Sequence, residues 1–113
     1  MQDPSSLTRW FAALQSPDQA ARDEAARRIW QEFAGELHAL VRRRLSAQIL
    51  AREDEHDVVQ SVFESFFRVQ SKRRYPLREA EELRRLLKSI AMCKIINTIM
   101  RHTAGRRNVW SER

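Results

Sequence analysis

Residues 54–68 carry two stripes that a single helix can present on neighbouring faces. Apolar side chains recur there every three or four residues and share one wide face of an α-helix: Val58, Val59, Val62, Phe63, Phe66 and Phe67. Asp57, Gln60 and Glu64 recur at the same spacings and form a polar stripe beside them. The segment therefore predicts a helix, reaching to about residue 70, that anchors a core with one face and offers the other to a partner.

Two more helices are predicted before this segment. In residues 5–14 the apolar residues share one helical face: Leu7, Trp10, Phe11 and Leu14. Ser16 and Pro17 are typical of a helix start, so a second helix is predicted over residues 17–45. Its apolar stripe consists of Ile29, Trp30, Phe33, Leu37, Leu40, Val41 and Leu45. Residues 46–53 are expected to connect it to the next helix.

A fourth helix is predicted after a loop at residues 71–77. It begins near residue 78 or 79, and Gly105 is its expected stop. Its inward face consists of Leu83, Leu86, Leu87, Ile90, Ala91, Ile95 and Ile99. Residues 106–113 are then expected to form a basic tail, or the start of a linker to an absent C-terminal domain.

The composition agrees with an all-α fold. Only two glycines and three prolines occur in 113 residues, and no strand pattern is visible. We expect one compact domain of about four helices over residues 1–105. No run approaches the ~20 apolar residues of a membrane span, and no signal peptide is visible. The single cysteine favours a reducing, cytoplasmic setting.

Enzymatic chemistry finds little support in the sequence. His38, His56 and His102 are widely separated, and no pair has the spacing of metal ligands. Cys93 lies on an otherwise apolar helix, so we expect a buried, inert thiol. The chain has no glycine-rich phosphate loop. The sequence therefore predicts a protein that is not an enzyme and that needs no cofactor or metal.

Positive charge gathers in the second half of the chain. Residues 1–67 hold eight Lys and Arg against eleven Asp and Glu, whereas residues 68–113 hold thirteen against four. A basic half suggests a polyanionic partner, because Lys and Arg neutralise phosphates. The alternative is a solvated basic surface, which the sequence leaves open.

The candidate nucleic-acid contacts lie on the last helix and in the loop before it. Asn and Arg can contact base edges, and an aromatic ring can stack on an unpaired base. Arg84 and Arg85 are weaker candidates, since Glu81 and Glu82 can pair with them. The favoured residues are Lys72, Arg73, Arg74, Tyr75, Lys94, Asn97, Arg101, Arg106 and Arg107.

Residues 54–63 resemble the region 2 signature of bacterial extracytoplasmic-function (ECF) RNA polymerase sigma factors, of the sigma-70 family. That family typically shows an acidic start followed by D-[VL]-V-Q-[ED]-[VT]-F, and the chain reads D-V-V-Q-S-V-F from Asp57. The segment with Trp30, Leu37 and Leu45 is similar to the family's first conserved segment. Residues 86–101 are similar to its promoter-reading helix. The chain departs from the family at Leu86, where Trp is common, and at Met92 and Cys93, where Arg and Asn are common.

The resemblance implies a helical domain that binds core RNA polymerase and recognises and melts the promoter minus-ten element. Asp57, Gln60 and Glu64 would dock on a coiled-coil of the largest polymerase subunit, with Arg43 and Arg44 as neighbours. Tyr75 and its basic neighbours, with Asn97 and Arg101, would hold the non-template strand. The resemblance also admits an anti-sigma factor as a partner.

Two alternatives remain at this stage. A small helical adaptor or decoy would bind polymerase through the same polar stripe without melting DNA. A basic helical bundle would bind nucleic acid without sequence preference, with a steep salt dependence.

Overall fold

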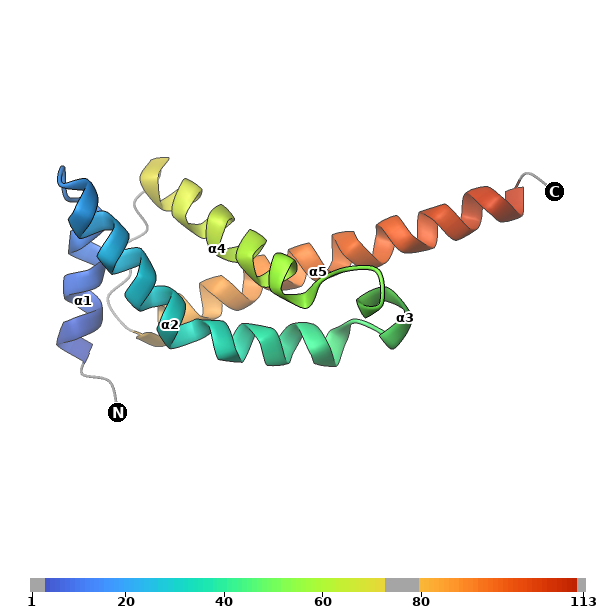
Figure 1. Cartoon of the computed structure of the whole chain (residues 1–113), viewed down its shortest axis with the longest axis horizontal. Helices are drawn as coiled ribbons and strands as arrows, with labels where there is room; N and C mark the ends of the chain where they lie inside the picture. The colour runs from blue at the N-terminus through green and yellow to red at the C-terminus, as the bar shows by residue number, and fades with distance from the viewer. Residues whose placement is uncertain (1–3, 73–79, 112–113) are drawn as a thin grey trace.

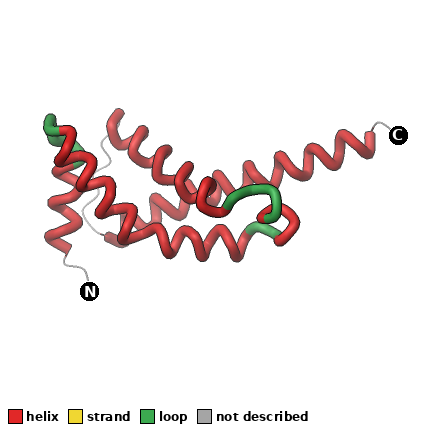
Figure 2. Tube along the Cα trace, in the orientation of Figure 1, coloured by secondary structure: helices red, strands yellow, loops and turns green. Residues whose placement is uncertain are grey.

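The computed structural model describes residues 4–72 and 80–111, and the side chains of residues 9–70 and 80–104. Within these ranges every regular element is helical (Figure 2). The helices are α1 (Pro4–Ala13), α2 (Gln19–Arg44), α3 (Ala47–Leu50), α4 (Glu55–Lys72) and α5 (Ala80–Ser111). The four helices expected from the sequence are confirmed, and the all-α fold with them. The short α3 is an addition within the expected connection.

The α4 helix lies at the centre of the packing. It contacts both α2 and α5, while α2 also contacts α5 and α1 packs on α2 (Figure 1). The buried core consists mainly of the predicted stripes, and its most enclosed large side chains are Phe33, Phe66, Ile29, Leu37, Leu83, Leu87, Ile95, Val41, Val59 and Val62. The apolar periodicity therefore identified the inward faces of α2, α4 and α5 correctly.

The helix ends differ from the sequence expectations in two places. Asp18, rather than Ser16, caps α2, since its side chain accepts a hydrogen bond from the Ala20 N–H at 3.1 Å. Ser16 instead accepts one from the Asp18 N–H. The expected stop at Gly105 is wrong, because α5 continues through it to Ser111. A helix of 32 residues results, and its C-terminal end extends beyond the other helices (Figure 1).

Candidate functional site

The polar stripe of α4 faces outward, as its spacing predicted. Asp57, Gln60 and Glu64 are exposed, while Val58, Val59 and four further apolar residues of the same helix pack inward. Of these inward residues only Phe67 is half-buried. The apolar face fixes the orientation of α4 on α2 and α5, so the three polar side chains project from a rigid helix in a defined row.

The end of α2 meets the start of α4 beside this stripe. Glu55 Oε2 lies 2.6 Å from His38 Nδ1, and Glu55 Oε1 lies 3.2 Å from Arg42 Nε. Arg43 and Arg44, the predicted neighbours of the stripe, are exposed on the same last turn of α2. The residue of this basic run that pairs with α4 is thus Arg42, which the sequence interpretation did not select.

Two of the three histidines, His38 and His56, lie side by side although they are far apart in the sequence. The rings of His38 and His56 are stacked with their centroids 5.7 Å apart, and Trp30 meets His56 edge-on at 5.6 Å. His102 lies elsewhere, beside Glu53. No group of three or more His, Cys, Asp or Glu side chains able to hold a metal ion occurs among the described residues.

A row of polar and basic side chains lies on residues 93–104 of α5, which we call its outer half. Lys94, Asn97 and Arg101 follow one another at intervals of three and four residues, so they share one helical face. Asn97 and Arg101 are exposed and Lys94 is half-buried. Buried Thr98 links this row, since its hydroxyl donates to the Lys94 carbonyl at 2.9 Å and accepts from Arg101 Nη2 at 3.3 Å.

The same half of α5 exposes apolar side chains. Ile96 is 48% and Met100 62% exposed, and they are the large hydrophobic residues that the described part of the chain leaves uncovered. Cys93 is also exposed, so the expectation of a buried thiol is wrong. Cys93 lies two residues from each of the buried Ala91 and Ile95, and at 100° per residue this turns its side chain away from the core.

The inner half of α5 uses its arginines within the fold. Arg84 lies 2.9 Å from Glu36 of α2 and 2.6 Å from Glu81, and its guanidinium sits 5.7 Å over the Phe33 ring. The hydrogen bonds that Arg84 donates to Glu36, and then to Glu81, raise the pKa of Arg84 above its ordinary value. Arg85 lies 3.7 Å from Glu81. These contacts agree with the sequence interpretation that ranked Arg84 and Arg85 below Lys94, Asn97 and Arg101.

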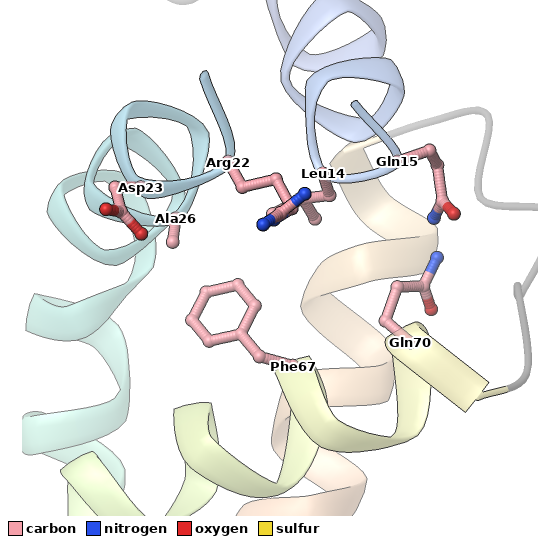
Figure 3. A pocket seen from close by; sticks show the side chains of 7 residues that line it. All are labelled: Leu14, Gln15, Arg22, Asp23, Ala26, Phe67 and Gln70. Carbon is pink, nitrogen blue, oxygen red and sulfur yellow. The ribbon is translucent and has the colours of Figure 1, made fainter. Parts of the chain in front are cut away.

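A pocket of about 240 Å³ opens at the other end of α4 from Asp57 (Figure 3). Phe67 forms much of its floor, and Arg22 reaches across it while donating to the Ser16 carbonyl at 2.6 Å. Its lining consists of Leu14, Gln15, Arg22, Asp23, Ala26, Phe67 and Gln70. The pocket contains no histidine, cysteine or paired carboxylates, so it offers no constellation for acid–base or nucleophilic catalysis.

The sequence matches the family model described as ECF sigma factor over residues 4–108. The chain belongs to the ECF sigma factor family. Comparisons with curated proteins and with solved structures found no match. The match covers all five helices except the last residues of α5, so the family assignment applies to the whole fold described above.

Membership of a sigma factor family gives the broad function. Sigma factors are transcription initiation factors rather than enzymes, and RNA polymerase and promoter DNA are the partners that the family implies. Across the described residues no helix is long and apolar enough to cross a lipid bilayer.

The structure does not describe several of the residues predicted to contact nucleic acid in this sigma factor. Arg73, Arg74 and Tyr75 lie outside the described residues altogether. Lys72, Arg106 and Arg107 lie within α4 and α5, but their side chains are not among those described. The predicted nucleic-acid residues that the structure does place together are therefore Lys94, Asn97 and Arg101.

Proposed function

We propose that this sigma factor chain docks on core RNA polymerase through the polar stripe of α4 and holds melted promoter DNA with α5. The observation that carries the proposal is the two-sided character of α4. Its apolar face is buried, and Asp57, Gln60 and Glu64 project together from the exposed side of a segment that resembles the family's region 2 signature. Polar side chains on a rigid helix suit recognition of another helical surface.

The outer half of α5 supports the second part of the proposal. Lys94 and Arg101 can neutralise phosphates, and Asn97 between them can contact a base edge. Melting a short stretch of duplex costs a few kcal/mol. Stacking and phosphate contacts to the released strand offset that cost without any chemical step. Arg73, Arg74 and Tyr75 of the preceding segment, together with Lys72, Arg106 and Arg107, are proposed to add to this grip.

The test is a pull-down of core RNA polymerase from a bacterial host by the wild-type chain and by Asp57→Ala and Gln60→Ala. We expect the wild type to retain polymerase and both variants to lose most of it, with unchanged circular dichroism. Asp57 lies in the acidic first turn of α4, where its charge also stabilises the helix. Gln60→Ala removes a contact residue without changing that charge, so it tests docking separately from helix stability.

Asp23→Ala is the matched control, because it removes an exposed carboxylate of α2 beside the pocket, at the far end of α4 from Asp57. It should retain polymerase as the wild type does. Equal capture by the wild type, Asp57→Ala and Gln60→Ala would contradict the docking assignment.

A further inference from the structure

Glu53 occupies a fixed place between α3 and α4. Its N–H donates to the Ile49 carbonyl at 2.8 Å, which continues the last turn of α3. The next residue, Asp54, accepts a hydrogen bond from the His56 N–H at 2.9 Å at the start of α4. Hydrogen bonds therefore hold the backbone at Glu53 and at the residue that follows it.

The carboxylate of Glu53 reaches the outer half of α5. Its Oε1 lies 3.5 Å from Arg101 Nη2 and 3.4 Å from His102 Nε2. Glu53 and His102 are mostly covered, with side chains 28% and 23% exposed, whereas Arg101 is 68% exposed. Glu53, in the connection between α3 and α4, thus contacts two consecutive residues of α5. A single anchored carboxylate thus faces the cation that ends the Lys94–Asn97–Arg101 row.

A carboxylate in this position opposes the binding of a phosphate. It already forms an ion pair with the guanidinium that a phosphate would contact, and its charge repels the incoming phosphodiester. An ion pair with one exposed partner is weak, so a strand held by several contacts can displace it. The contact therefore reduces affinity for nucleic acid without preventing binding.

We propose that Glu53 is a built-in competitor that occupies Arg101 until a phosphodiester strand displaces it. This inference rests on the proposed role of Arg101 in holding DNA. Residues 68–113 hold thirteen Lys and Arg. A contact of this kind lowers the affinity of so basic a chain for polyanions in general. Strands that also satisfy Lys94 and Asn97 retain enough contacts to displace it.

The experiment measures binding of a fluorescein-labelled single-stranded oligothymidylate to the full chain by fluorescence anisotropy at low salt. The variants are Glu53→Gln, Arg101→Ala and the double variant with both changes. We expect Arg101→Ala to weaken binding and Glu53→Gln to tighten it about threefold, the scale of an exposed ion pair. The double variant should bind like Arg101→Ala, because Glu53 acts through Arg101.

Glu36→Gln is the matched control. It removes the same charge from a carboxylate of α2 that pairs with another arginine of α5, Arg84. It should leave affinity near the wild-type value if the effect is local. Glu53→Ala, which cannot accept a hydrogen bond from Arg101, is the second variant and guards against a new contact formed by the glutamine. Thermal melts verify that each variant is folded.

The outcomes separate the two proposals. If Arg101→Ala weakens binding but neither Glu53 variant tightens it, the competitor role is overturned and the DNA role of Arg101 stands. Tightening that persists without Arg101, or that Glu36→Gln reproduces, also overturns the competitor role. If Arg101→Ala leaves binding unchanged, both proposals for this part of α5 fail.

Discussion

The Trp30 and Phe63 rings pack with their centroids 4.6 Å apart and their planes tilted by 50°. Trp30 belongs to α2 and Phe63 to the middle of α4, so this contact joins the two helices directly beneath the polar stripe. Phe63 is 2% exposed and also lies 6.2 Å from the Phe67 ring. The orientation of Asp57, Gln60 and Glu64 therefore depends on an aromatic cluster on the adjoining face of their helix.

Replacing Phe63 with alanine is expected to destabilise the fold by ~3–5 kcal/mol, because it leaves a cavity against Trp30. Urea denaturation followed by circular dichroism measures the loss. Phe67→Ala is the matched control, since this ring is only half-buried on the same helix, and it should cost clearly less. Equal losses for the two variants would contradict the larger contribution assigned to Phe63 and its contact with Trp30.

A substitution at Gly35 is expected to stabilise the fold. Gly35 is exposed within α2, and a methyl group added at its Cα would meet nothing within 4 Å apart from the neighbouring residues and backbone of its own helix. Glycine inside a helix costs about 0.5–1 kcal/mol relative to alanine, because the unfolded chain loses more freedom. Gly35→Ala should therefore raise the free energy of unfolding by that amount, measured by the same denaturation. A decrease would indicate that α2 needs the flexibility of this residue.

Asn97 and Lys94 should affect DNA binding differently if α5 holds the promoter strand. Asn97→Ala is expected to reduce discrimination between a promoter-like and a scrambled strand, because a lost base contact costs ~1–3 kcal/mol for the preferred base. Lys94→Ala should lower the affinity for both strands alike. It should also reduce the slope of log affinity against log salt concentration by about 0.7, the value for one phosphate contact on a single strand. Anisotropy titrations of polymerase holoenzyme at several salt concentrations separate the two. An equal loss on both strands for Asn97→Ala would assign it to the backbone.

The spacing of apolar residues predicted the fold, because the buried face of a helix is made of side chains three or four residues apart in the sequence. The stripes of residues 17–45 and 54–68 became the buried faces of α2 and α4, and Asp57, Gln60 and Glu64 came out exposed. Helix ends were less predictable: α5 runs through Gly105, because a glycine costs a helix only about 1 kcal/mol and does not by itself end it.

Contacts between helices could not be predicted in the same way. The Glu53 contact with His102 joins residues 49 positions apart, and the His38–Glu55 contact joins residues 17 apart. Such pairs depend on how helices cross, which a period of 3.6 residues does not specify. The sequence did show charges that could attract one another. Acidic Glu53 and Glu55 flank the start of α4, and basic residues end α2 and lie along α5.

Glu24 should make folding stability depend on pH over a limited acidic range. Its carboxylate accepts hydrogen bonds from Arg27 and from Arg28 Nε, the latter at 2.8 Å, within one exposed face of α2. The hydrogen bond from Arg27, followed by that from Arg28, lowers the pKa of Glu24 below its ordinary value of 4.5. Because the folded state holds the carboxylate ionised, the contribution is complete above pH 4.5 and disappears as the pH falls through the lowered pKa.

The measurement is the difference in melting temperature between the wild type and Glu24→Gln across this acidic range. We expect a small deficit for the variant at neutral pH, since both arginines are solvent-exposed and surface pairs contribute little. The deficit should shrink on acidification, because protonated Glu24 resembles glutamine. A difference that stays constant as Glu24 protonates would show that glutamine changes the propensity of α2 rather than an ionic contact.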